Sequence, residues 1–300
     1  MVKSKKMFGV FLIITLITIC LRTMLIINNT GVDGMYIHES STMVNILKAI
    51  TIISCLFFGV LPYLDKAPEE NRTRNKDKLL GFSMMIFGGV MMFIGLVDFF
   101  NILQVVWSPN IREIISLIYM TPNAVIKIIL ALSTFISGWM TSTISIKVLS
   151  GVPINNNYLV SIMFTVSLFI RGLLFFKCTS TIATISDNAY IILAISFGTL
   201  FLYSACRLLF NCEIKSGYRL AVSSGYLAIF FGLLNTVPNY VAFFMKKNLF
   251  FSVKDTNGIS NIAVAFFAII FLFIILFSDG EIKNMFVEKA KIENSKSNIE

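Results

Sequence analysis

A chain of 300 residues of which 56% are hydrophobic and only 14% charged, with a mean hydropathy of +0.82, lies outside the range of soluble domains. This composition predicts an integral membrane protein. The formal net charge of +9 does not indicate nucleic-acid binding, because no soluble segment is large enough to gather the basic residues on one face.

Apolar runs close to the length of a membrane-spanning helix recur along the whole chain. About 20 helical residues cross the hydrocarbon core of a bilayer. The runs do not alternate apolar with polar residues, as the strands of a barrel would. The sequence therefore predicts an all-α membrane protein with eight transmembrane helices. The expected ranges are residues 7–27, 43–63, 79–101, 124–148, 158–176, 188–210, 218–241 and 262–277.

The basic residues predict the orientation of these helices. The first run follows Lys3, Lys5 and Lys6 but precedes no small-residue cleavage site, so we expect it to stay as a helix rather than act as a signal peptide. Of the 25 Lys and Arg residues, sixteen fall on the side of the N-terminus, six on the other side, and three within the runs. The imbalance predicts that both termini are cytoplasmic.

Two stretches of the first half of the chain are each similar to a stretch of the second half. Residues 88–98 (GGVMMFIGLVD) return as residues 225–235 (GYLAIFFGLLN), and residues 17–25 align with residues 166–174. Each half then contributes four helices in the same order. Because four crossings restore the starting side, the halves would have the same orientation, related by a two-fold axis along the membrane normal.

This alignment sets the expected boundaries. Residues 1–150 form a first four-helix half, residues 151–278 a second four-helix half, and residues 279–300 a short cytoplasmic tail. The two halves would be tandem repeats.

Four residues near the outer helix ends are a candidate ligand or ion-pair site. The alignment pairs Arg22 with Arg171, and Asp98 with Asn235. A buried arginine in a membrane is costly, so each either snorkels to the interface or faces inward, toward a carboxylate or a bound anion. Asp98 could pair with one arginine and fix the packing of two helices. The neutral Asn235 would leave the other arginine able to bind a small anionic ligand.

Small and hydroxyl residues mark particular helix faces. Glycines recur seven residues apart in the third and seventh runs, a spacing that favours close helix packing. Hydroxyls follow one face of the fourth run, at Ser133, Ser137, Thr141 and Ser145. These hydroxyls either bond to their own helix in a packed interface or line a hydrated cavity. In the cavity alternative the eighth run, which has no polar residue from 262 to 277, faces lipid.

The sequence has no motif for catalysis or metal binding. It contains no phosphate-binding loop, no HExxH and no GxSxG elbow. The single histidine, His38, is predicted across the membrane from Cys206 and Cys212, and only Cys178 lies in an outer loop. We therefore expect no enzymatic activity, no cofactor, no metal ion and no disulfide.

The stretch from Arg22 through Asn29-Thr30-Gly31 to Gly34-Met35-Tyr36 is similar to uncharacterised polytopic membrane proteins of AT-rich bacteria, and so is the preference for Ile, Asn and Lys over Val, Ala and Arg. The resemblance implies a multi-pass protein of a bacterial plasma membrane. It implies no particular activity.

Two classes of function stay open. The first is a small-molecule permease or transporter-like component, with the candidate site and the hydroxyl face around an outward-facing cavity. The second is a non-transporting assembly partner or sensor, whose intramembrane charges only hold helices together. The expected partners are the lipid bilayer, a small anionic ligand in the first class, and an unidentified membrane protein in the second.

Overall fold

The computed structural model is helical throughout the residues that it describes, which are 2–29, 42–64, 78–106, 121–151, 158–179, 186–210, 214–245 and 256–277. Its helices are α1 (Val2–Asn29), α2 (Thr42–Leu64), α3 (Lys78–Val106), α5 (Thr121–Ser150), α6 (Tyr158–Thr179), α7 (Ser186–Leu209), α8 (Ile214–Phe244) and α9 (Thr256–Phe277). Each predicted run coincides with one helix. The all-α prediction is confirmed, and no strand occurs among the described residues.

The helices have the length and surface of membrane-spanning segments. Seven of them are long and apolar enough to cross a bilayer, and the apolar segment Thr165–Phe176 of α6 is shorter. Large apolar side chains cover the outside of the bundle, with Ile13, Ile53 and Leu64 exposing 60%, 65% and 75% of their surface. Soluble monomers rarely expose a continuous apolar surface of this kind. These faces suit contact with lipid chains.

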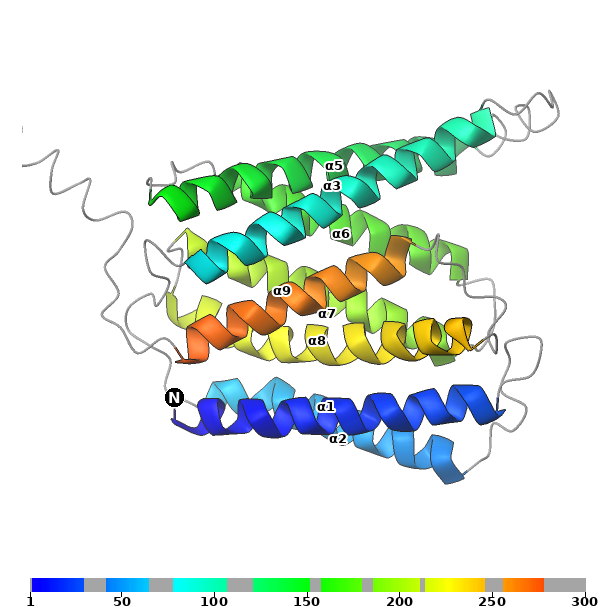
Figure 1. Cartoon of the computed structure of the whole chain (residues 1–300), viewed down its shortest axis with the longest axis vertical. Helices are drawn as coiled ribbons and strands as arrows, with labels where there is room; N and C mark the ends of the chain where they lie inside the picture. The colour runs from blue at the N-terminus through cyan, green and yellow to red at the C-terminus, as the bar shows by residue number, and fades with distance from the viewer. Residues whose placement is uncertain are drawn as a thin grey trace, which may run out of the picture.

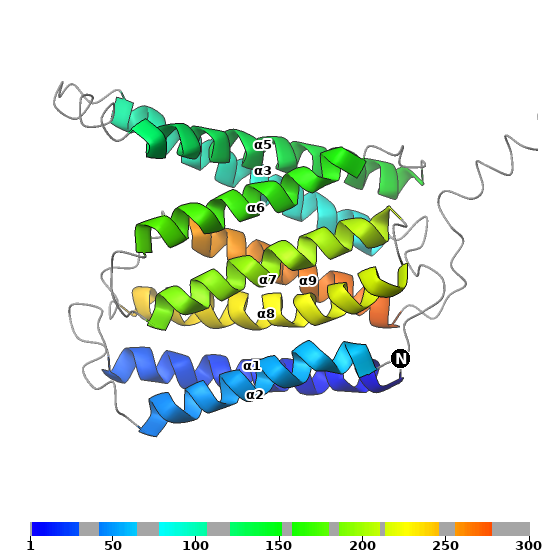
Figure 2. The same ribbon diagram turned by 180° about the vertical axis from the view of Figure 1, so that it is seen from behind.

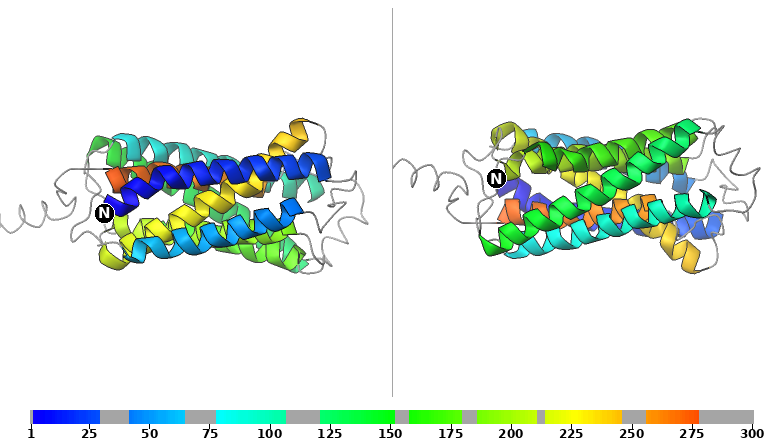
Figure 3. Two further views of the ribbon diagram at one scale, coloured as in Figure 1. Left: turned by 90° about the horizontal axis from the view of Figure 1, so that it is seen from below. Right: turned by 90° about the horizontal axis from the view of Figure 1, so that it is seen from above.

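The helices lie side by side in a flattened bundle (Figures 1 and 2). The α3–α5 pair forms one edge, α6, α7, α8 and α9 fill the middle, and the α1–α2 pair forms the other edge. Helix α8 packs against both α1 and α2 and crosses them at an angle (Figure 3). Helix α1 begins and α9 ends at the same end of the bundle (Figure 1). We call this the N-terminal end, and the opposite half the outer half, after the predicted orientation.

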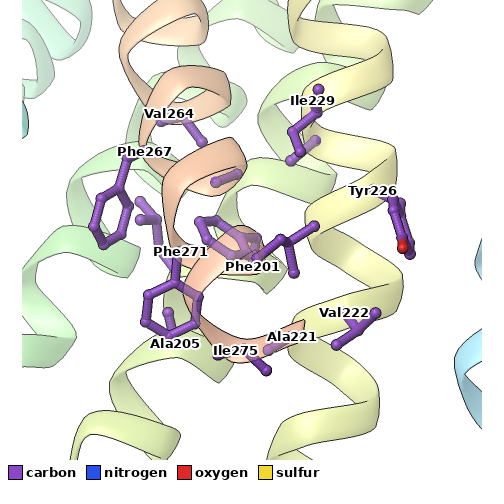
Figure 4. Close-up of a cluster of buried hydrophobic side chains, with 14 of the residues drawn as sticks. Phe201, Ala205, Ala221, Val222, Tyr226, Ile229, Val264, Phe267, Phe271 and Ile275 are labelled. Atoms are coloured by element: carbon purple, nitrogen blue, oxygen red, sulfur yellow. The ribbon is translucent and has the colours of Figure 1, made fainter. Parts of the chain in front are cut away.

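Aromatic and aliphatic side chains from α7, α8 and α9 form the hydrophobic core (Figure 4). Phe201, Tyr226 and Phe271 are fully buried there. Helix α9 packs against α3, α7 and α8, which explains why thirteen of its 22 residues are buried. The expectation that the eighth run faces lipid is therefore wrong. Its lack of polar residues reflects a position in the middle of the bundle.

Glycines allow α3 and α5 to pack so closely that their backbone atoms are in contact. A methyl group at Gly88 would lie 2.8 Å from the carbonyl oxygen of Gly138, and one at Gly95 would lie 2.7 Å from the backbone nitrogen of Phe135. Because real Cβ atoms do not come so close to backbone atoms, only glycine fits these positions. The seven-residue spacing predicted this kind of packing.

Some helix pairings occur in both predicted halves, and others occur in only one. The α1–α2 pair has a counterpart in α6–α7, and the α3–α5 pair has one in α8–α9. However, α7 packs extensively along α8, whereas α2 and α3 are not packed together among the described residues. The tandem repeat and the boundaries of the two halves stay predictions.

Candidate functional site

A buried ion pair and the hydrogen bonds around it join three helices in the outer half. Arg171 on α6 exposes 3% of its side chain, and its Nη2 donates a hydrogen bond to Oδ2 of Asp98 on α3 over 2.6 Å. Its Nη1 donates to Oγ1 of Thr256 at 3.0 Å and to Oδ1 of Asn257 at 3.2 Å, both on α9. The Thr256 hydroxyl in turn donates to Oδ1 of Asp98 at 2.8 Å. We call these four residues the Arg171 network.

Within the Arg171 network the charges of Arg171 and Asp98 are balanced by each other and by hydrogen bonds. Charge-assisted hydrogen bonds of this length are stronger than neutral ones. Asp98 receives a hydrogen bond on both carboxylate oxygens, one from a cation and one from a hydroxyl. A buried charge without such partners would be strongly unfavourable in the low dielectric of a bilayer. The network therefore holds α3, α6 and α9 in one arrangement.

The second arginine lies in a different environment. Arg22 on α1 is fully buried, and its guanidinium carbon lies 4.2 Å from the ring centroid of Tyr190 on α7. This is a cation–π contact, which strengthens when water is excluded. The Tyr190 ring lies 6.3 Å from that of Phe231 on α8. Thus Arg22 and Arg171, which the alignment pairs, are both buried rather than snorkelling, but they contact different groups.

Polar atoms without a hydrogen-bond partner lie on α8 and α9 in the outer half. Asn235, the residue aligned with Asp98, is 4% exposed, and its Oδ1 makes no hydrogen bond with any described residue. The same holds for Oγ of Ser260, which is fully buried, and Nδ2 of Asn261, which is 3% exposed. We call Asn235, Ser260 and Asn261 the polar seam.

The polar seam continues the Arg171 network deeper into the bundle. Ser260 and Asn261 follow Thr256 and Asn257 by four residues, so they lie about one helical turn, roughly 6 Å, further along the same faces of α9. A methyl group at Gly232 on α8 would lie 3.1 Å from the Asn261 carbonyl oxygen. This close approach brings α8, which carries Asn235, against the polar turns of α9.

Unsatisfied buried polar atoms are rare in native structures, because each costs roughly 1 to 3 kcal/mol. The polar seam presents an acceptor on Asn235, a donor on Asn261 and a hydroxyl that can act as either on Ser260. Groups of this kind are satisfied by buried water or by a bound polar molecule. The outer half therefore combines these unsatisfied groups with the Arg171 network one helical turn away on α9.

The hydroxyl face of the fourth run lies in a helix interface. Ser137, Thr141 and Ser145 are buried, and Ser133 is half-buried. Ser133, Ser137 and Thr141 donate to carbonyl oxygens of their own helix. Ser145 donates to the carbonyl oxygen of Gly81 on α3 at 2.7 Å. These contacts are those of the packing alternative rather than of a hydrated cavity.

Sequence reasoning missed the polar residues of α9 and the aromatic partner of Arg22. The predicted run begins at 262, which assigns Thr256, Asn257, Ser260 and Asn261 to the preceding loop. In the structure they belong to the first two turns of α9. A Thr-Asn pair before an apolar run is a helix-start signal that could have found them. No comparable signal points to Tyr190.

The described residues hold no group of three or more His, Cys, Asp or Glu side chains that could bind a metal ion. His38 and Cys212 lie outside the described residues, and Cys178 belongs to the last turn of α6. The fold and the apolar surface define the class of the chain as a helical, multi-pass membrane protein. Comparisons with protein-family models, curated proteins and solved structures found no match.

Proposed function

We propose that this protein is a small-molecule permease or transporter-like component that binds a small polar or anionic solute in the outer half of the bundle. The observation that carries the proposal is the polar seam, whose three buried polar atoms have no hydrogen-bond partner among the described residues. A solute with both donor and acceptor groups would satisfy them. Because Asp98 already neutralises Arg171, it is the guanidinium of Arg22 in the same half that favours a negative charge on that solute.

The proposal includes a topology. Eight crossings with both termini in the cytoplasm of a bacterial cell place the polar seam near the outer surface. The basic residues of the connecting segments support this orientation. Two four-helix halves of the same orientation are part of the proposal, and the shared pairings α1–α2 with α6–α7 and α3–α5 with α8–α9 support them.

The Asn235→Leu variant tests the proposal, because leucine has a similar size but no hydrogen-bonding group. Purified wild-type protein is melted in detergent with inorganic phosphate, acetate or glycine as the probe. A bound solute raises the melting temperature in a concentration-dependent way. We expect at least one probe to stabilise the wild-type protein and to have no effect on the variant.

The control is Asn101→Leu, which makes the same change at an exposed position of α3. This variant should keep the response to the probe. If no probe shifts the wild-type protein, or if Asn235→Leu responds like Asn101→Leu, the solute site is contradicted.

A second candidate is a non-transporting assembly partner or sensor. It is favoured by the Arg171 network, in which the arginine and the carboxylate already satisfy each other, and by the tight α3–α5 interface. In that case Asn235→Leu would remove an amide whose oxygen is unsatisfied and would disturb no solute. The variant would then be as stable as the wild type or more stable, with no change in any solute response.

A further inference from the structure

A groove lies on the surface of the bundle at its N-terminal end, between α1, α3 and α9. Its volume is about 530 Å³, which falls within the range of roughly 300 to 1,000 Å³ that is usual for ligand sites. Eight of its nine lining residues are apolar or glycine, and the ninth is a lysine. The lining residues are Lys6, Phe8, Gly9, Leu12, Leu79, Ile269, Ile270, Phe273 and Phe277.

Gly9 keeps this groove open without serving helix packing. A glycine inside a helix costs about 1 kcal/mol relative to alanine, and close packing against α5 offsets this cost at Gly88 and Gly95 of α3. At Gly9 there is no such gain, because a methyl group there would meet no atom within 4 Å. Gly9 is exposed and lines the groove. A larger side chain at this position would project into the groove rather than into a neighbouring helix.

The walls of the groove are aromatic and aliphatic side chains. The rings of Phe8 and Phe277 lie 6.0 Å apart in an edge-to-face contact, and those of Phe273 and Phe277 are stacked at 5.1 Å. Leu12 and Phe273 remain 37% and 48% exposed. The groove is therefore lined by packed apolar side chains and opens sideways, toward the hydrocarbon of one leaflet.

Positive charge lies at the membrane-surface end of the groove. Lys6 is exposed and lines it. Lys78, also exposed, directly precedes Leu79, another lining residue. None of the nine lining residues is acidic. An apolar groove that ends at basic residues complements a molecule with an acyl chain and an anionic headgroup.

We propose that this groove is a binding site for an anionic phospholipid of the leaflet at the N-terminal end, which is the cytoplasmic leaflet in the predicted orientation. An acyl chain lies over Gly9 and against Ile270 and Phe273 of α9, and the phosphate contacts Lys6. The bound lipid bridges α1 to α3 and α9. Helix α1 otherwise packs mainly on α2 and α8, so the lipid adds a contact between α1 and the helices α3 and α9.

Native mass spectrometry of the full chain, titrated with dioleoylphosphatidylglycerol or dioleoylphosphatidylcholine, tests the proposal. The wild-type protein should retain the anionic lipid in preference to the zwitterionic one. G9L, which fills the groove, should lose retention of both lipids. K6Q should bind the anionic lipid about fivefold more weakly, the loss expected for one basic residue near an anionic surface.

The controls change the same residue types away from the groove. Gly89 on α3 is exposed and, like Gly9, would place an added methyl group with no atom within 4 Å, so G89L should bind lipid like the wild type. K147Q removes an exposed lysine from the last turn of α5 and should also have no effect.

The proposal is overturned if G9L retains as much lipid as G89L, if K6Q binds like K147Q, or if the two lipids bind equally. A dimer that G9L abolishes would assign the groove to a second copy of the chain instead. If G9L does not accumulate, the comparison of anionic-lipid binding by K6Q and K147Q tests the proposal by itself, because neither variant alters apolar packing.

Discussion

Asp98 and Arg171, 73 residues apart in the chain, meet in an ion pair of 2.6 Å that is 3% exposed on the arginine side and 16% exposed on the carboxylate side. Removing one partner of a buried pair leaves the other charge uncompensated. We therefore expect Arg171→Leu to lower the free energy of unfolding by roughly 3 to 5 kcal/mol, measured by denaturant unfolding in detergent.

The double variant Asp98→Leu with Arg171→Leu distinguishes the effect of an unpaired charge on stability from the effect of altered packing. Replacement of a whole buried pair by apolar residues is often close to neutral, so the double variant should be more stable than Arg171→Leu alone. If the two single changes were simply additive in the double variant, the residues would not be coupled, contrary to the structure.

Thr256 should matter through its hydroxyl group. It accepts a hydrogen bond from Arg171 and donates one to Asp98, and hydrogen bonds to charged groups contribute roughly 1.5 to 3 kcal/mol each. Thr256→Val keeps the shape and removes both bonds, so its melting temperature should fall. Thr256→Ser should stay close to the wild type. Equal melting of the valine and serine variants would show that the hydroxyl is not part of the network.

Two neighbouring glycines on α3 should respond in opposite ways to alanine. At Gly88 the added methyl group would lie 2.6 Å from Ser142 Oγ and 2.8 Å from the Gly138 carbonyl oxygen. Overpacking of this kind typically costs roughly 1 to 3 kcal/mol. Gly89→Ala meets no atom within 4 Å and should be neutral or slightly stabilising, because alanine favours the helix. Thermal unfolding of the two variants measures the difference.

The contact between Arg22 and Tyr190 predicts a dependence on the aromatic ring. Tyr190→Phe keeps a ring under the guanidinium, whereas Tyr190→Leu removes it. A desolvated cation–π contact contributes about 2 kcal/mol, so the leucine variant should unfold at a lower denaturant concentration than the phenylalanine variant. The difference should disappear when Arg22 is replaced by Gln. A difference that persists there would assign the effect to packing alone.

The sequence predicted the helices well because each has to supply a long apolar run of its own. It also indicated the close packing of α3, since glycines seven residues apart leave one face of a helix without side chains. It could not predict which helices become neighbours. That choice placed α9 in the middle of the bundle, where an entirely apolar helix is as suitable as it would be in lipid.

Of the residues of the candidate site, the sequence predicted only the charged ones and Asn235. Arg22, Arg171, Asp98 and Asn235 are conspicuous because polar groups are costly in a membrane. Their partners are not, since Thr256 and Asn257 look like loop residues and Tyr190 like one of many interfacial aromatic residues. The alignment of the halves also pairs residues without saying what they contact. Only the structure distinguishes the ion pair of Arg171 from the aromatic contact of Arg22.

Access from the outer side tests the proposed solute site most directly. In a variant whose five cysteines are replaced by serine, Ser260→Cys places a thiol in the polar seam, and Ala265→Cys places one in the apolar part of α9, where Ala265 is fully buried. A membrane-impermeant sulfonate thiol reagent is then added to whole cells. If the seam receives polar solutes from outside, the thiol at position 260 is modified and the thiol at position 265 is not. Equal protection of both thiols would contradict the site.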